Sequence, residues 1–228
     1  LEYTMELTSG TFIQDGRYAI TGSRDSTAQL WELESEKIVM RFSGHKDPVS
    51  CVAASLDGRF IVTASEDTLA KLWDISSGKD VMTFNGHDDR ILGVAFSPDD
   101  YFLVTTSGDK TANIYDTSTG KEIMKLTGHL KAVLSVAYSP DGYHLATSSA
   151  DEMVKIWDSI TGNVIMSLQA GGGRVFSVTY SPDGRHLATS SEDKAARIWD
   201  LWAQDLSSKG KSTFGILDDA TRQYISKK

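Results

Sequence analysis

Cysteine, long apolar runs and positive charge are all scarce in this sequence of 228 residues. Cys51 is the only cysteine, so an internal disulfide is excluded, and such cysteine usage is typical of a reducing compartment, the cytoplasm or the nucleus. No segment approaches the roughly 20 consecutive apolar residues of a membrane helix, and the first residues lack the basic-then-apolar order of a secretory signal. We therefore expect a soluble intracellular protein without a membrane association.

The formal net charge is −8, from 23 basic and 31 acidic side chains. An acidic chain is repelled by the phosphates of nucleic acid and by anionic lipid, so neither is expected as a partner. The rest of the composition is ordinary, since 40% of the residues are hydrophobic and the chain is long enough to bury a large core. Together these values predict a folded globular protein.

An aromatic residue followed by an acidic one recurs at a constant interval of 42 residues. The five pairs are Trp31-Glu32, Trp73-Asp74, Tyr115-Asp116, Trp157-Asp158 and Trp199-Asp200. Gly-His pairs recur at the same interval in three units, at Gly44-His45, Gly86-His87 and Gly128-His129. A repeat of this length determines the architecture before any single residue does.

Each unit has the pattern of four short strands joined by turns. The first is an apolar, β-branched run such as residues 91–96, and a turn such as Ser139-Pro140-Asp141-Gly142 ends it. The second run stops at an aspartate present in every unit, at Asp25, Asp67, Asp109, Asp151 and Asp193. The third ends in the aromatic-acidic pair, and a Ser/Thr-Gly turn leads to the fourth. One such sheet cannot cover both its faces, so successive sheets must stack, and a radial stack makes them propeller blades.

With Gly-His, the turn aspartate and Trp-Asp at one period, the sequence resembles the WD40-repeat β-propellers over about residues 2–200. The resemblance implies an all-β fold of four-stranded antiparallel blades. We expect WD40 repeats over residues 1–200 and an extension without the repeat over 201–228. The expected units are residues 2–43, 44–85, 86–127, 128–169 and 170–211.

Five units are visible, whereas seven blades are the commonest number in that family. The chain is therefore either a five-bladed ring or part of a larger, seven-bladed one, and we favour a piece of a longer polypeptide. The period is lost after Asp200, and residues 211–217 are the best candidate for the fourth strand of the last unit.

In the family that the sequence resembles, a structural hydrogen-bond network joins the Gly-His histidine, a Ser or Thr of the second strand, the turn aspartate and the third-strand tryptophan. The matching residues are His45, Thr63, Asp67, Trp73, His87, Thr105, Asp109, Tyr115, His129, Thr147, Asp151 and Trp157. Buried polar groups need partners, and an ionised aspartate can anchor such a chain of donors. Ser65 lies on the same strand face as Thr63, so the sequence leaves open which hydroxyl takes part.

The first and fifth units lack the histidine. Glu2-Tyr3 and Ala170-Gly171 stand where Gly-His is expected, so we expect the networks around Asp25 and Asp193 to be weaker. Ala170-Gly171 continues into Gly172-Gly173, which is either a phosphate-binding loop or, as we favour, a loosened one.

Histidine, hydroxyl and carboxylate are also the members of a hydrolase triad. Catalysis needs one exposed nucleophile, however, whereas this set recurs in several units at fixed spacing, as a scaffold does. Metal binding by His45, His87 and His129 is also disfavoured, because successive blades hold them apart. The sequence thus predicts no catalytic residue, no metal and no cofactor.

The resemblance implies a non-catalytic scaffold that binds protein or peptide partners, as a member of a large complex. The loops after Gly-His and around the turn aspartates should share one flat side, which we call the loop face. Its candidate partner-binding residues are Arg24, Lys46, Asp47, Glu66, Asp88, Asp89, Arg90, Lys131, Arg174 and Glu192. The alternative is a sensor or regulatory domain of a larger protein such as an NTPase or kinase, and the flanking coding sequence would distinguish the two.

Overall fold

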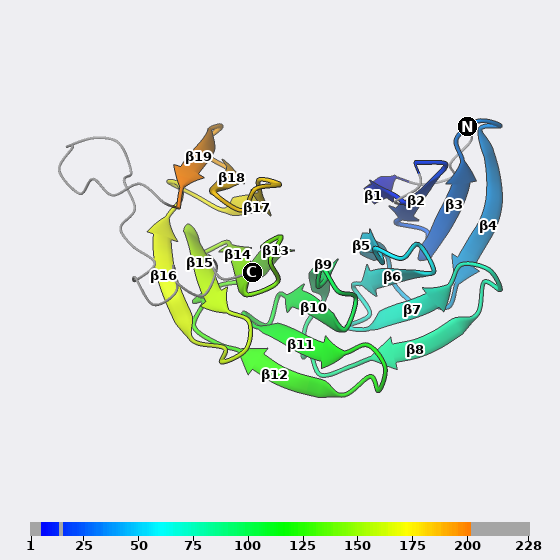
Figure 1. The fold of residues 1–228 in the computed structure, drawn as a ribbon, viewed down its shortest axis with the longest axis horizontal. Coiled ribbons are helices and arrows are strands. Elements are labelled where there is room, and N and C mark those ends of the chain that lie inside the picture. Colours follow the sequence, from blue (N-terminus) through cyan, green and yellow to red (C-terminus); the bar gives the residue numbers. More distant parts are fainter. Residues whose placement is uncertain (1–5, 14–15, 202–228) are drawn as a thin grey trace.

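The computed structural model describes residues 6–13 and 16–201, and all regular structure in these residues is β-strand. Nineteen strands form five antiparallel sheets, which are arranged as the blades of a propeller (Figure 1). The all-β propeller fold predicted from the repeat is confirmed. In the described part of the chain, no helix is long and apolar enough to cross a membrane.

The sheets follow one another along the chain, and we number them as blades 1 to 5. Blade 1 comprises β1 (Leu7–Phe12), β2 (Tyr18–Ser23), β3 (Thr27–Glu32) and β4 (Lys37–Ser43). Blade 2 comprises β5 (Val49–Ala54), β6 (Phe60–Ser65), β7 (Ala70–Asp74) and β8 (Asp80–Phe84). Blade 3 comprises β9 (Ile91–Phe96), β10 (Phe102–Ser107), β11 (Ala112–Asp116) and β12 (Glu122–Leu126).

Blade 4 comprises β13 (Val133–Tyr138), β14 (His144–Ser149), β15 (Met153–Asp158) and β16 (Val164–Gln169). Blade 5 comprises β17 (Val175–Tyr180), β18 (His186–Ser191) and β19 (Ala196–Asp200), three strands within the described residues. The fourth strand predicted at residues 211–217 and the extension at 201–228 lie outside the described residues, except for Leu201.

Burial along the strands follows from this stacking. The second strand of an inner blade is buried at nearly every position, as in β6 and β10, because a neighbouring blade covers each face. The fourth strand lies at the circumference and alternates instead: Val81 of β8 is exposed, whereas Phe84 is fully buried. The near-continuous apolar second strands of the sequence are thus strands covered on both faces.

The core consists of apolar clusters between adjacent blades. Phe42 at the end of blade 1 packs on Trp73 of blade 2, with ring centroids 5.6 Å apart. Phe84 packs in the same way on Tyr115 of blade 3, at 5.3 Å. The two contacts are equivalent and lie 42 residues apart in the sequence. At both interfaces the aromatic residue of the repeat packs against the preceding blade.

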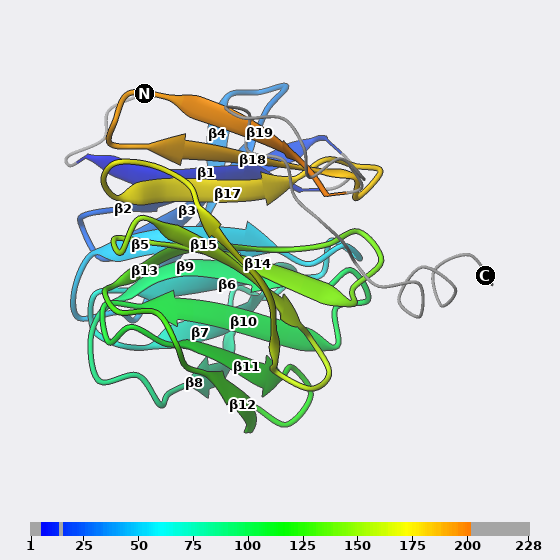
Figure 2. The ribbon, with the colours of Figure 1, turned by 90° about the vertical axis from the view of Figure 1, so that its left-hand side faces the viewer.

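The five blades form an open arc. Their innermost strands pack in the order β1, β5, β9, β13, β17, and Figure 1 shows a gap between blade 5 and blade 1. Seen from the side in Figure 2, the strands of successive blades are stacked with similar tilt. The sheets do not close into a ring within the described residues, which is consistent with part of a larger propeller.

Candidate functional site

The residues predicted to form the structural network of blade 2 lie within hydrogen-bond distance of one another. Trp73 Nε1 donates to Thr63 Oγ1 at 2.9 Å, and the same oxygen lies 2.8 Å from His45 Nε2. Because an indole N–H can only donate, the Thr63 hydroxyl oxygen accepts from Trp73 Nε1. The hydroxyl proton of Thr63 is then donated to His45 Nε2. His45 Nδ1 lies 2.9 Å from Asp67 Oδ2. A neutral histidine with its proton on Nδ1 satisfies every atom of this chain.

Blade 4 repeats this arrangement, and blade 3 modifies it. His129 lies 2.8 Å from Thr147 Oγ1 and 2.9 Å from Asp151 Oδ2, and Trp157 Nε1 donates to Thr147 at 2.8 Å. In blade 3 the corresponding distances from His87 to Thr105 and Asp109 are both 2.8 Å. Here Tyr115 replaces the tryptophan, and its hydroxyl donates to the carbonyl of Asn85 at 3.0 Å.

The strand register brings threonine and tryptophan together. Trp73 of β7 pairs directly with Ile61 of β6, so Thr63, two residues further along β6, is its diagonal neighbour on the same face of the sheet. A diagonal neighbour lies within reach of a long aromatic side chain. The threonine four positions before each turn aspartate therefore takes part in the network.

Ser65, the alternative that the sequence left open, has another role. Its hydroxyl accepts the backbone N–H of Asp67 at 3.1 Å and donates to the carbonyl oxygen of Asp47 at 2.9 Å. Ser107 and Ser149 bond to the carbonyls of Asp89 and Lys131 in the same way, at 2.8 and 3.1 Å. The threonine thus serves the buried network, and the serine fixes the adjoining loop.

The turn aspartates stay ionised in this setting. Burial favours the neutral form of the Asp67 carboxyl, but the N–H of Lys46 and the ring of His45 stabilise the carboxylate, and the pKa of Asp67 lies below its ordinary 3.8. The pKa values of Asp109 and Asp151 are lowered against burial by similar bonds. Burial also lowers the pKa of His129 below 6.5, although Asp151 opposes this. In blade 4 a neutral histidine therefore lies against a charged carboxylate.

In blade 5 an arginine takes the place of the missing histidine. Arg197 Nη2 donates to Asp193 Oδ2 at 2.5 Å, and Arg197 Nη1 donates to the carbonyl of Ala170 at 3.1 Å. Trp199 Nε1 still donates to Thr189 Oγ1, at 2.9 Å. The sequence analysis missed Arg197, which lies two residues before the tryptophan. Asp193 is thus held by a cation, although this unit has no Gly-His histidine.

The glycine-rich loop of blade 5 packs closely on its own sheet. Gly172 N donates to Asp193 Oδ2 at 3.3 Å, and a side chain at Gly171 would collide with Ser191. The loop therefore bonds to the turn aspartate and approaches β18 where only glycine fits. In blade 1, Thr27 donates to Asp25 through both its N–H and its hydroxyl, and the expected Glu2-Tyr3 position lies outside the described residues.

Most of the predicted partner-binding side chains are exposed on the loops beside this network. Lys46, Asp47, Asp88, Asp89, Arg90 and Lys131 are exposed, as are Arg24, Arg174 and Glu192, whereas Glu66 is half-buried. Three of them are paired within the chain: Arg24 lies 3.1 Å from Glu6, and Arg174 lies 3.9 Å from Glu192. The sequence analysis missed Leu130, which is 77% exposed on the same face. An apolar residue directly after Gly-His was the signal for it.

The network hydroxyls do not have the geometry of a nucleophile. Thr63, Thr105 and Thr147 are at most 1% exposed, so a substrate has no access to their oxygens. Each of the three histidines is bonded to the aspartate of its own blade. In residues 6–13 and 16–201 no group of three or more His, Cys, Asp or Glu side chains is arranged to hold a metal ion. The arrangement satisfies buried polar atoms and bonds to the adjoining loops.

Comparison with protein families gives a match over most of the chain. A family model described as "WD domain, G-beta repeat" matches five segments, residues 4–32, 36–74, 78–116, 120–158 and 162–200. Every segment ends at an aromatic-acidic pair of the repeat.

Proposed function

Because the chain belongs to the WD40-repeat family, whose repeats generally mediate interactions between proteins, we propose that it is a non-catalytic scaffold that binds protein or peptide partners on its loop face. One observation carries this proposal: the buried network that recurs from blade to blade also bonds to the backbone of the exposed loops. The framework is therefore constant, while the side chains that it presents differ in every blade.

The bonds to the loop backbone come from the turn aspartates. Asp67 Oδ2 accepts the N–H of Lys46 at 3.0 Å, and Asp109 Oδ2 accepts the N–H of Asp88 at 3.1 Å. Asp151 Oδ2 accepts the N–H of Leu130 at 2.8 Å. Each residue after Gly-His is thus held before a partner arrives, and a pre-organised surface loses less conformational entropy on binding.

The character of the presented side chains supports a protein partner. Asp88, Asp89 and Arg90 put both signs of charge on one loop, and Leu130 adds an exposed apolar group on the next blade. A mixture of apolar and charged groups suits recognition of a protein surface, whereas a phosphate backbone would require a basic one. The net charge of −8 also disfavours a phosphate backbone as the partner.

The proposal is tested by reversing two charges on the loop face. The variant Asp88→Lys with Arg90→Glu leaves the net charge unchanged and should lose the proteins that co-purify with the wild type in quantitative pull-downs. The matched control, Glu34→Lys with Lys121→Glu, makes the same exchange at exposed positions after β3 and before β12. Retention of all partners by both variants would remove this part of the loop face as the docking site.

A further inference from the structure

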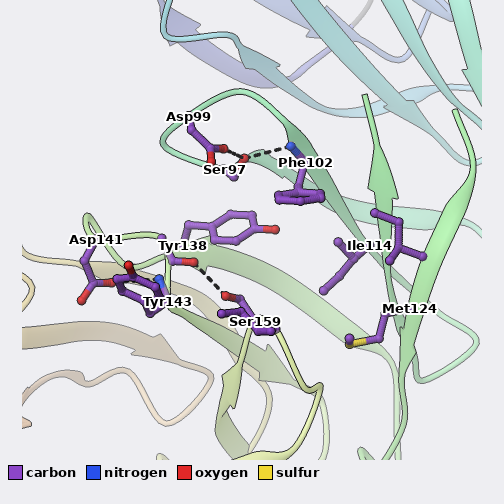
Figure 3. Close-up of a pocket in the computed structure, with 12 residues that line it drawn as sticks. Ser97, Asp99, Phe102, Ile114, Met124, Tyr138, Asp141, Tyr143 and Ser159 are labelled. Atoms are coloured by element: carbon purple, nitrogen blue, oxygen red, sulfur yellow. Dashed lines mark hydrogen bonds between the residues drawn. The ribbon is translucent and has the colours of Figure 1, made fainter. Parts of the chain in front are cut away.

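An apolar groove lies between blades 3 and 4 on the side of the molecule opposite the loop face. It has a volume of about 450 Å³, within the usual range of ligand pockets, and is formed by the turns after β9, β13 and β15 together with the start of β12. Each first strand runs from the loop face to the opposite side, so the turns after β9 and β13 lie away from the loop face. In the view of Figure 3, Asp99 and Asp141 lie toward one end, and Ile114 and Met124 lie toward the other.

One position of the repeat that lines the groove holds a small residue. Ile75 packs against the core between blades 1 and 2, and Leu201 is buried between blades 4 and 5. Both lie directly after the aromatic-acidic pair. Between blades 3 and 4 this position is Ser159, which donates to the carbonyl of Gly142 at 2.8 Å. A serine fills much less space than leucine or isoleucine, and the difference leaves a hollow between the blades.

The walls of the groove expose apolar surface that the fold does not use. Phe102, Ile123 and Ile160 are 38%, 51% and 69% exposed, and they come from the start of β10, the start of β12 and the turn after β15. Tyr138 forms part of the floor, and burial raises the pKa of its hydroxyl well above the ordinary 10. Clustered apolar side chains around a concave site are typical of a binding surface.

The charge of the groove indicates which ligand would fit. Asp99 and Asp141 are the only charged residues among those that line it. One oxygen of each carboxylate is used within its own turn: Asp99 Oδ1 accepts the hydroxyl of Ser97, and Asp141 Oδ1 accepts the N–H of Tyr143. Within the described residues no hydrogen bond to the Oδ2 atoms is formed, so these oxygens remain available to a cationic group.

We propose that this groove is a second docking site, for a peptide segment of a partner protein that places an aliphatic or aromatic side chain between the blades and a lysine or arginine on Asp99 or Asp141. The groove and the loop face lie on opposite sides, so the two sites bind their partners independently. The chain can then hold one partner on the loop face and a second partner in the groove at the same time.

The decisive variant fills the groove. Ser159→Leu introduces the residue found at the corresponding position in blade 5. The new leucine should pack between blades 3 and 4 as Leu201 packs between blades 4 and 5. Thr117→Leu is the matched control, because Thr117 occupies the same position between blades 2 and 3 and its hydroxyl also donates to a turn carbonyl, that of Asp100, at 2.8 Å. Both variants lose one similar hydrogen bond, and only Ser159→Leu blocks the groove.

Random peptides displayed on phage serve as the probe, selected on the 228-residue chain and counter-selected on Ser159→Leu. The enriched peptides should carry an apolar residue within a few positions of a lysine or arginine. Their affinity, measured by fluorescence anisotropy, should fall at least about tenfold in Ser159→Leu and change less than about twofold in Thr117→Leu. Failure to enrich any peptide, or equal binding to Ser159→Leu, would overturn the proposal.

The charge requirement is tested separately. Asp99→Asn with Asp141→Asn should weaken the same peptides by about three- to tenfold at low salt, and by less at high salt. Asp57→Asn with Asp183→Asn removes the equivalent turn carboxylates of blades 2 and 5 and should have no effect. Enriched peptides without a basic residue would contradict the proposal. So would peptides that bind Ser159→Leu normally but lose affinity for the loop-face variant Asp88→Lys with Arg90→Glu, since these would use the loop face.

Discussion

The carboxylate of Asp100 in blade 3 accepts the backbone N–H of Leu56 in blade 2, at 2.8 Å. It also accepts the N–H of Asp57, at 3.0 Å. Asp100 stands where the four other turns have glycine, and its φ of 61° lies in the left-handed region. An aspartate tolerates this conformation better than most residues do. The turn that lacks the glycine of the other units thus bonds two blades together.

We predict that Asp100→Ala destabilises the protein by about 1–2 kcal/mol, because it loses both bonds and keeps an unfavourable φ. Asp100→Asn should cost less, since its amide oxygen can still accept and asparagine also adopts positive φ readily. Urea unfolding of the three proteins should give the order Asp, Asn, Ala in free energy of unfolding. An alanine variant as stable as the wild type would show that water replaces the carboxylate without cost.

Two serines at the same position of the repeat should respond differently to alanine. Ser107 in blade 3 accepts the N–H of Asp109 and donates to the carbonyl of Asp89. Ser191 in blade 5 is buried, and its hydroxyl has no hydrogen-bond partner within the described residues. Ser107→Ala should therefore cost about 1–2 kcal/mol and Ser191→Ala about zero, or even stabilise, by thermal unfolding. An equal loss of stability in the two variants would contradict the inference that only Ser107 is bonded to its loop.

Asp109 joins more groups than any other residue of its network. Its carboxylate lies 2.8 Å from His87 Nδ1, accepts the N–H of Asp88 at 3.1 Å, and accepts the N–H and hydroxyl of Thr111 at 2.9 and 2.7 Å. Asp109→Ala leaves a buried histidine without its partner and should cost about 1–3 kcal/mol in chemical unfolding. Asp88→Ala, at an exposed neighbour, should change stability by less than about 0.5 kcal/mol. A melting temperature that Asp109→Ala did not move would mean that water satisfies the network.

The blades could be predicted from the sequence because the stacking itself imposes the repeat. A strand covered on both faces must be apolar, a tight turn requires Asp and Gly, and the residue that joins two blades must be large, so each unit has the same pattern at a 42-residue spacing. The threonine and tryptophan of the network could be named from the family resemblance, whereas the spacing alone leaves Ser65 open as the alternative to Thr63. In the structure the bonded pairs lie 10 residues apart in blades 2 and 4.

Three features were beyond prediction because they depend on contacts made by side chains that vary among repeats. Arg197 replaces an imidazole from a position that is lysine in two other units, Lys71 and Lys155, and its role requires the fold of the glycine-rich loop. The bonds of Asp100 cross to another blade. The groove at Ser159 is evident only once this position is known to lie between blades. In each case the repeat predicts the strands and turns, whereas the role of a residue that departs from the repeat is known only from its contacts in the structure.

The pH dependence of stability follows from the buried histidines. Burial lowers the pKa values of His129 and His144 below 6.5, so between that value and the lower folded pKa the unfolded chain binds more protons than the folded one. Stability should therefore be complete above pH 6.5 and fall as the pH drops toward 5, a range above the ordinary pKa of 3.8 of the turn aspartates. Each histidine contributes at most about 1.4 kcal/mol per pH unit.

Thermal unfolding of the wild type and of His129→Gln between pH 7.5 and 5 checks this sign. Glutamine keeps a polar side chain but does not titrate, so the variant should start less stable at pH 7.5 and lose less stability on acidification. His186→Gln is measured beside it, because His186 is half-buried in blade 5 and lies outside the network. A wild-type stability that stayed constant from pH 7.5 to 5 would contradict the lowered histidine pKa values, and one that increased would mean that the network holds protonated imidazolium. Thr147 would then have lost its acceptor on His129 Nε2, and the bonding scheme of all three blades would have to be reversed.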